Sequence, residues 1–147
     1  MRATERMRRG RGLGWLLSAA VVTLSSCVDP PLNPANELPI GVVDTPAAGE
    51  VLRPGPTLVG GWAVDDTRIV EIRIYFDGRF VARTTVTVAR PDVAKALPKY
   101  ARDGDLHGWN VVVDFAATAG AHTILAQAVD SSGATRDIGA IAITVPR

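Results

Sequence analysis

The segment Val70-Glu-Ile-Arg-Ile-Tyr-Phe76 and the Asp77-Gly78 pair that follows it decide the fold class. Apolar residues occupy every second position of this segment: Val70, Ile72, Ile74 and Phe76. Such alternation is typical of a strand that buries one face. Asp-Gly favours a two-residue hairpin turn because both positions tolerate positive φ. We therefore predict a β-hairpin whose second strand runs over residues 79–88.

The rest of the sequence beyond residue 40 repeats this pattern of short strands and turns. Further strands are predicted at 41–44, 57–64, 109–115, 122–130 and 138–145. The residues expected on buried faces are Trp109, Val111, Val113 and Phe115, then Ile124, Ala126 and Ala128. Turns are expected at 119–120 and 130–133. About seven short strands without crossover helices predict an all-β, antiparallel sandwich.

Residues 90–107 interrupt the strand pattern. Within this interval, residues 90–100 are predicted to form a short helical segment. Pro91 suits its first position, and Asp92 lies near the positive end of its dipole. Pro98 is expected to end it, because proline cannot continue a helix.

Long connections on a β scaffold are often where binding occurs, so this loop is the expected binding region. We expect Arg90 and Asp92 to pair across its base, and Val93 to plug the core. The candidate binding residues are Arg90, Asp92, Tyr100, His107 and Trp109.

Several short motifs occur in an order that resembles a bacterial immunoglobulin-like domain. They are Gly61-Trp-Ala-Val-Asp-Asp66, Asp77-Gly78, Ala89-Arg-Pro-Asp-Val-Ala94, His107-Gly-Trp109, Gly120-Ala-His-Thr-Ile124, Ala128-Val-Asp130 and Gly133. The resemblance covers nearly all of residues 40–147 and implies an immunoglobulin-like sandwich. Trp109 stands where the family pattern leads us to expect phenylalanine, which leaves the expected fold unchanged. Such domains are usually spacers or adhesion modules of larger extracellular proteins.

The first 26 residues are expected to be an export signal. Five arginines within the first eleven residues precede an uncharged apolar run over residues 13–24. This run is too short for a bilayer span of roughly 20 residues, but it suits the apolar region of a signal peptide.

Cys27 is the only cysteine of the chain, and it directly follows Leu24-Ser25-Ser26. An aliphatic residue, two small residues and a cysteine resemble the lipobox of bacterial lipoproteins. The resemblance implies that the thiol receives a diacylglyceryl group, that the signal is cut before Cys27, and that the new N-terminus is acylated. Several acyl chains, at ~0.8 kcal/mol per buried CH2, would anchor the chain durably. The alternative is an ordinary signal peptide in which a cysteine falls near the cleavage point.

Residues 27–39 are expected to form the lipidated cysteine and a tether before the domain at 40–147. Four prolines within residues 28–39 oppose helix and central strand, and they favour an extended spacer of about 3 Å per residue. Five of the sixteen basic residues and one of the fifteen acidic residues precede Cys27, which leaves a net charge of −3 beyond it. Nucleic acid is therefore not an expected partner.

The sequence contains no nucleophile elbow, phosphate-cradling glycine loop or cysteine-rich metal motif. His122 begins a predicted strand, where a capping or packing role is expected, and His107 lacks an identified nucleophile. The aspartates of Asp65-Asp66 and Asp103-Gly-Asp105 offer oxygen ligands, but without EF-hand spacing. Aspartate is favoured in turns in any case. We expect neither enzyme activity, nor a cofactor, nor a metal site.

The aromatic residues leave the nature of the partner open. Trp62 and Trp109 are expected in the core, whereas Tyr75 and Tyr100 are candidates for contact with a sugar or a protein. We expect a module in the cell envelope, anchored by lipid to the outer or cytoplasmic membrane and facing the periplasm or the exterior, that contacts an envelope protein or glycan. The alternatives are a carbohydrate-binding or calcium-dependent accessory protein that uses the 90–109 loop, and a passive spacer.

Overall fold

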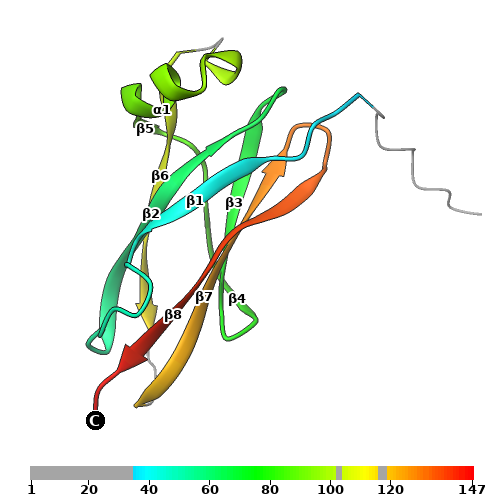
Figure 1. Ribbon diagram of the computed structural model, residues 1–147. Coiled ribbons are helices and arrows are strands. Elements are labelled where there is room, and N and C mark those ends of the chain that lie inside the picture. Colours follow the sequence, from blue (N-terminus) through cyan, green and yellow to red (C-terminus); the bar gives the residue numbers. More distant parts are fainter. Residues whose placement is uncertain (1–34, 102–103, 116–118) are drawn as a thin grey trace, which may run out of the picture. The chain divides into compact units, whose positions relative to one another are not determined.

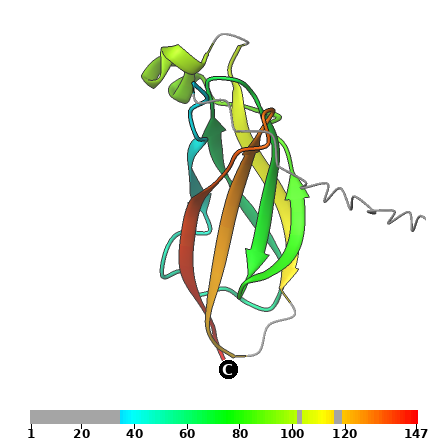
Figure 2. The same ribbon diagram turned by 90° about the vertical axis from the view of Figure 1, so that its right-hand side faces the viewer.

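The computed structural model describes residues 35–101, 104–115 and 119–147, which form two antiparallel sheets (Figure 1). Sheet I has the strand order β1-β2-β6-β5, and sheet II has the order β4-β3-β7-β8. The strands are β1 (Ile40–Thr45), β2 (Gly55–Val64), β3 (Ile69–Phe76), β4 (Arg79–Thr84), β5 (Val88–Ala89), β6 (Leu106–Phe115), β7 (Gly120–Asp130) and β8 (Thr135–Val145). Figure 2 shows the two sheets packed face to face. The predicted immunoglobulin-like β-sandwich is confirmed.

The core lies between the sheets, where alternate residues of facing strands meet. Its buried members include Trp109, Val113 and Phe115 of β6 and Ile124, Ala126 and Ala128 of β7. Val111 is partly buried and packs against the same cluster. Both predicted buried faces are therefore confirmed.

The predicted hairpin joins β3 to β4. Asp77 and Gly78 have φ values of 47° and 75°, the positive values that a two-residue turn of this kind requires. His122 on β7 holds the turn, because its Nδ1 lies 2.7 Å from Asp77 Oδ2 and its ring stacks on Phe76. His122 thus has the packing role that we expected for it.

The prediction that Val70 shares the buried face of this strand is wrong. Ile69, Ile72 and Ile74 are buried, whereas Val70 is 40 % exposed. The pairing of β3 with β7 shifts register between Ile69 and Glu71. Such a bulge adds one residue to a strand, so the side chains before it change face.

The prediction of an unbroken second strand over residues 79–88 is also wrong. β4 ends at Thr84, and β5 pairs with β6 in the other sheet. The Thr84 hydroxyl donates to the Asn110 carbonyl at 3.0 Å, and the Thr87 N–H donates to the Gly108 carbonyl at 2.9 Å. The chain therefore crosses from sheet II to sheet I between these two strands.

The loop after β5 contains the predicted helical segment. Helix α1 (Pro91–Ala96) begins with Pro91, and a 3-10 turn, η1 (Pro98–Tyr100), follows it. Val93 is buried, at 4 % exposure, which confirms its predicted packing role.

Residues 49–52 cover the outer edge of β8. The N–H groups of Gly49 and Leu52 donate to the carbonyls of Ala142 and Thr144, and the Thr144 N–H donates to the Glu50 carbonyl. Unpaired strand edges are sites at which other chains can add. This short segment therefore satisfies backbone hydrogen-bonding groups along part of the β8 edge.

The end of the predicted tether is bound to the domain. Asn36 Nδ2 donates to Asp130 Oδ2 at 2.7 Å, the Glu37 N–H donates to Asp66 Oδ1 at 3.1 Å, and Pro39 is fully buried. The folded unit thus includes residues before position 40, which shortens the stretch available as a spacer.

The expected export signal, the Leu24-Ser25-Ser26 motif and Cys27 lie outside the described residues. Among the residues that the structure describes, no helix has the length and apolar character needed to cross a membrane.

Candidate functional site

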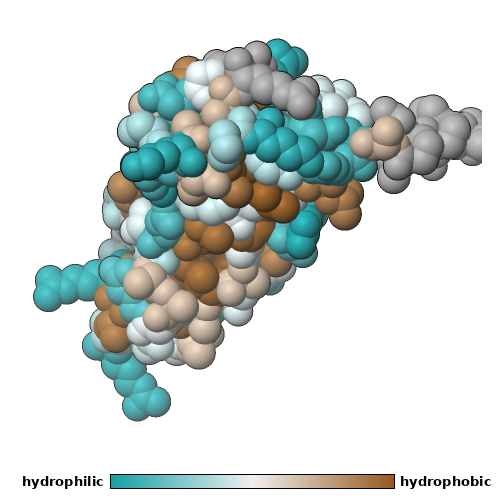
Figure 3. Space-filling view, turned by 45° about the horizontal axis from the view of Figure 1, so that its top comes forward, coloured by the Kyte–Doolittle hydropathy of each residue, from teal (hydrophilic) through white to brown (hydrophobic). Residues whose placement is uncertain are grey.

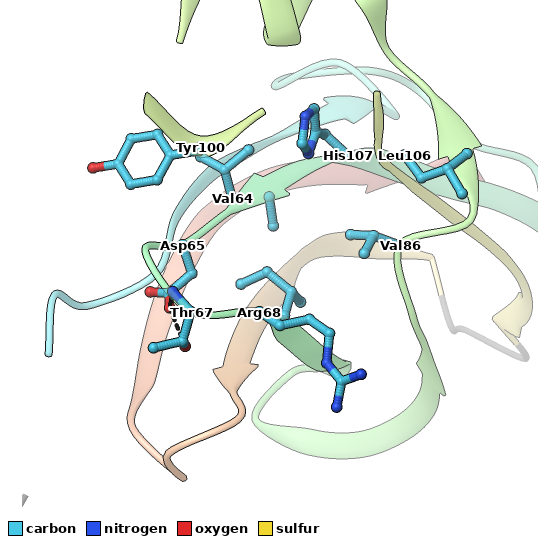
Figure 4. A pocket seen from close by; sticks show the side chains of 10 residues that line it. Val64, Asp65, Thr67, Arg68, Val86, Tyr100, Leu106 and His107 are labelled. Atoms are coloured by element: carbon cyan, nitrogen blue, oxygen red, sulfur yellow. Dashed lines mark hydrogen bonds between the residues drawn. The ribbon is translucent and has the colours of Figure 1, made fainter. Parts of the chain in front are cut away.

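A cavity of about 80 Å³ lies at the end of the sandwich that carries α1 (Figure 4). Its walls come from the end of β2, the start of β3, the crossing between β4 and β5, and the start of β6. The apolar lining residues are Ala63, Val64, Ile69, Val86 and Leu106. The polar lining residues are Asp65, Thr67, Arg68, Tyr100 and His107. A small hollow that combines apolar and polar side chains is a suitable place to bind a ligand group.

Two residues of the cavity wall each carry a buried polar atom without a hydrogen-bond partner among the described residues. These atoms are Asp65 Oδ2 and His107 Nε2. Asp65 is 7 % exposed and His107 is 9 % exposed. Leaving such a group unsatisfied costs about 1–3 kcal/mol. Both atoms therefore retain a strong tendency to accept or donate a hydrogen bond.

The negative charge of Asp65 is only partly compensated by the protein. Thr67 donates to Asp65 Oδ1 through its N–H at 2.8 Å and through its hydroxyl at 2.6 Å. Burial nevertheless raises the pKa of Asp65 above its usual value, and the nearby charges of Asp130 and Asp66 add to this rise. A positive group placed against Asp65 would favour its ionised form.

Tyr100 lines the cavity and connects it to the N-terminal segment. The Tyr100 hydroxyl donates to Glu37 Oε2 at 2.8 Å, and Lys99 forms an ion pair with the same carboxylate. The hydrogen bond from Lys99, and then the one from Tyr100, lower the pKa of Glu37. In Figure 4 the hydroxyl of Tyr100 points away from His107, so its hydrogen-bonding group serves Glu37 rather than the cavity.

A wider hollow of about 400 Å³ adjoins the cavity and shares four of its lining residues, Arg68, Ile69, Val86 and Leu106. Two apolar side chains on its rim are unusually exposed, Val70 at 40 % and Leu106 at 53 %. Figure 3, which brings the top of Figure 1 forward, shows hydrophobic side chains exposed among hydrophilic ones on the face that it displays. The cavity therefore continues into an apolar surface groove.

Arg90 and Asp92 form a clamp on the outer face of sheet I, away from the cavity. Arg90 Nε and Nη2 donate to the two carboxylate oxygens of Asp92 at 2.9 and 2.8 Å, and Nη1 donates to Asp44 Oδ2 at 2.7 Å. The Arg90 stem crosses Gly108, where a Cβ atom would lie 2.9 Å from Arg90 Cγ. The predicted pairing across the loop base is confirmed, and its role is to join α1 to β1 and β6.

We expect Arg90→Ala to lower the free energy of unfolding at pH 7 by about 1 kcal/mol, through lost packing and lost links. Arg90 lowers the pKa of Asp92 to about 2, below its ordinary value of about 3.9. The part of this stabilisation that comes from the ion pair with Asp92 is therefore present above about pH 4 and is lost as the pH falls through 2. Urea titrations at pH 7 and pH 2 measure the difference. Lys95→Ala, an exposed change on the same helix, should have no effect; an equal loss there would contradict the clamp.

The structure brings together only part of the predicted binding set. Tyr100 and His107 both line the cavity, whereas Arg90 and Asp92 belong to the clamp. Trp109 is 1 % exposed and belongs to the core, so it presents no aromatic surface to a ligand. Its inclusion among the binding residues is corrected, because the alternation of β6 directs it inward.

Sequence reasoning missed Arg68 and Val86 as cavity residues, and it treated Asp65 as a turn residue with a possible calcium role. The signal for Asp65 was a carboxylate directly after an apolar strand, but its burial depends on distant elements. Within the described residues, no three side chains of His, Cys, Asp or Glu are grouped so as to hold a metal ion.

No protein-family model and no curated protein sequence matches this chain. Solved structures share its fold. Fibronectin(III)-like modules of Clostridium thermocellum CbhA align with 72 % of this chain and 45 % of their own, at 17 % identity and a TM-score of 0.50. The CARDB domain of a Pyrococcus furiosus protein, solved in complex with di-metal ions, aligns with 76 % of this chain and 94 % of its own, at 10 % identity and a TM-score of 0.44. This chain thus spans less than half of the clostridial chain, and the likeness shows an immunoglobulin-like or fibronectin-like β-sandwich.

Proposed function

We propose that this chain is exported, anchored by lipid at Cys27, and displays its β-sandwich in the cell envelope as a non-catalytic binding module. The Leu24-Ser25-Ser26-Cys27 motif after an apolar leader supports the anchor. The observation that carries the binding role is the cavity, whose wall combines apolar side chains with Asp65, Tyr100 and His107. A ligand group that enters this cavity meets both apolar and polar side chains.

The position of the cavity fits a module that is held from its N-terminal side. Glu37 is bonded to Tyr100, a cavity residue, and the Glu37 N–H is bonded to Asp66. The segment that leads toward Cys27 therefore enters the domain beside the site. A partner in the same envelope layer is consequently the kind of molecule that would meet the cavity.

We expect Cys27→Ser to abolish anchoring completely, because the hydroxyl cannot form the thioether. The protein should move from the membrane fraction to the soluble fraction of the native host, and mass spectrometry of the wild type should find a diacylglyceryl group on Cys27. Ser26→Ala keeps a small residue before the cysteine, so it should remain membrane-bound. An unmodified thiol in the wild type, or retention of the leader, would refute the anchor.

The binding role is tested separately by site-specific photo-crosslinking in the native host. A crosslinker at exposed Leu106, on the rim of the cavity, should give discrete adducts with an envelope component. The matched control is a crosslinker at exposed Ala121, near the start of β7. The same adducts from both positions would show that the cavity end has no particular partner.

A further inference from the structure

We propose that strand β4, an edge strand of sheet II, pairs with an extended acidic segment of a partner protein, which joins the sheet as a fifth strand. This contact is additional to the cavity, because the hollow that borders β4 shares no lining residue with it. The open backbone of β4, the hollow beside it and the charge of its outer face each support the inference.

The two edge strands of sheet II differ in how far they are covered. Figure 2 shows β8 and β4 on opposite sides of this sheet. β8 is bonded to residues 49–52, and its Gly139 lies so close to β1 that a Cβ atom there would be 2.8 Å from Val43 Cγ2. β4 pairs with β3 on one side, and among the described residues no strand pairs with its other side. β4 is therefore the edge at which a further strand can be added.

Two residues of β4 direct their backbone groups toward this open side. Arg79 pairs with Phe76 across the two-residue turn, so the N–H and carbonyl of Arg79 face β3. This orientation alternates along a strand, and the backbone groups of Phe80 consequently point away from β3. Val81 is the extra residue of a bulge, beyond which the backbone groups of Arg83 point away from β3 in the same manner. An added strand therefore meets a donor and an acceptor at each of these two positions.

A hollow of about 310 Å³ lies beside this edge, between β4 and the end of β6. Its lining residues are Phe76, Arg79, Phe80, Val81, Asp114 and Phe115. The rings of Phe76 and Phe115 stack with their centroids 4.5 Å apart, and Val81 is 40 % exposed. Arg79 and Asp114 carry opposite charges, so the hollow as a whole is neutral. Every second side chain of an added strand would face this hollow, and an apolar side chain suits its aromatic wall.

The outer face of β4 favours an acidic side chain on the added strand. Arg83 pairs with Arg73 across the strands, and its guanidinium carbon lies 5.9 Å from the ring centroid of Phe80. Arg73 is bonded to Glu71 at 2.6 Å, whereas Arg83 has no carboxylate partner among the described residues. A pair of opposite charges on neighbouring strands stabilises a sheet. A glutamate or aspartate beside Arg83 would supply the charge that this arginine lacks.

A second copy of this chain suits the edge less well than an acidic strand. Pairing of two β4 strands would bring Arg79 and Arg83 of both copies into one short seam, without an acidic residue on either strand. Like charges on paired strands destabilise a sheet. Bulges and charged side chains are also means by which edge strands avoid pairing with themselves. The charge of β4 thus selects an acidic segment as the occupant.

The test uses the full-length protein in detergent and the peptide acetyl-Glu-Val-Glu-Val-Glu-Val-Glu-amide, which presents glutamates on one face and valines on the other when it is extended. NMR titration should show binding, and amide hydrogen exchange at Phe80 and Arg83 should slow in the complex. The same peptide with lysine in place of glutamate should bind at least about tenfold more weakly. A peptide with its four glutamates followed by its three valines should also bind more weakly, because it cannot separate the two kinds of side chain between two faces.

Methylation of the peptide nitrogens distinguishes an added strand from contact through side chains alone. Cross-strand partners share a face, so the glutamates lie opposite Phe80 and Arg83 and exchange hydrogen bonds with them. Methyl groups on the nitrogens of the inner glutamates should therefore abolish binding. Methyl groups on the valine nitrogens, which point away from β4, should leave the affinity within about threefold.

Charge variants of the protein locate the contact on β4. Arg83→Glu should weaken binding of the acidic peptide about tenfold, because a pair of opposite charges becomes a pair of like charges. The same variant should bind the lysine peptide more tightly than the wild type does, a gain that a misfolded protein would not show. Arg136→Glu makes an equal charge change at an exposed position of β8, the other edge strand, and should leave the affinity within about twofold.

Each other outcome overturns the inference. Equal binding of the acidic and lysine peptides would contradict the charge preference, and binding of the peptide methylated at its glutamates would contradict the added strand. A peptide-free dimer in sedimentation that Arg83→Glu disrupts would show that the edge serves a second copy, and no binding at all would show a closed edge. Crosslinking from Leu106 reports on the cavity alone, so failure there and failure of peptide binding are separate results.

Discussion

Replacing Trp109 by alanine is expected to lower the free energy of unfolding by about 3–5 kcal/mol. The indole is 1 % exposed and lies in the core between the two sheets. Its removal leaves a cavity that the surrounding side chains can fill only in part. Because small domains are stable by only about 5–15 kcal/mol, this loss is a large share of the total. Urea denaturation followed by circular dichroism measures it.

Trp62→Ala is the matched control for this change. Trp62 is only half-buried, which corrects the expectation of a core position for it, and the loss should be about 1 kcal/mol. Trp109→Phe should cost less than Trp109→Ala, because the indole Nε1 has no acceptor among the described residues and phenylalanine removes that unsatisfied donor. Equal losses at positions 62 and 109 would contradict the packing described here.

Gly61→Ala is expected to lower the free energy of unfolding by about 3 kcal/mol or more. A Cβ atom at position 61 would lie 2.0 Å from the Val42 carbonyl oxygen and 3.0 Å from Trp109 Cζ2. The first of these atoms belongs to the backbone of β1, so a side-chain rotation cannot relieve the overlap. We expect β1 to separate from β2, which amide hydrogen exchange of residues 40–45 would detect.

A neighbouring glycine separates this overlap from the general effect of adding a methyl group to β2. A Cβ at Gly60 would lie 3.0 Å from the Trp109 carbonyl oxygen and farther from every other neighbour, so Gly60→Ala should cost less than Gly61→Ala. Combining Gly61→Ala with Trp109→Phe should not restore stability, because the overlap with Val42 remains. Recovery in that double variant would show that the indole, and not the β1 backbone, sets the requirement for glycine.

Local patterns were sufficient for most of the fold. The hairpin at Asp77-Gly78 follows from one dipeptide with a strong backbone preference. The buried faces of β6 and β7 follow from alternation, which a strand cannot shift without exposing its apolar side. The pairing of Arg90 with Asp92 is also local, because only Pro91 lies between them.

The errors fall where one segment depends on another that is distant in sequence. Val70 is an apolar residue in phase with its neighbours, and only the bulge opposite β7 exposes it. The apolar and threonine residues of 79–88 suit either sheet, so the crossing at Thr84 is decided by contacts with β6. The alternation of apolar and polar residues predicts neither the bulged pairing of β3 with β7 nor the contacts of the crossing with β6.

The candidate site was only partly predictable for the same reason. Tyr100 and His107 belong to the long loop that was expected to bind, whereas Asp65 and Val86 come from other connections. Burial of Asp65 without a full set of donors is a property of the assembled end of the sandwich. The spacing of residues in the sequence gives no information about this burial.

The attachment of Asn36 and Glu37 to the domain also limits where a lipid-anchored molecule of this kind could act. If Cys27 carries the anchor, the eight residues 28–35 reach at most about 29 Å, even fully extended. Since this link joins the domain beside Tyr100, the site stays within a shallow zone above the bilayer. The domain could then contact only molecules exposed at that distance from the bilayer, however abundant the same molecules are farther out.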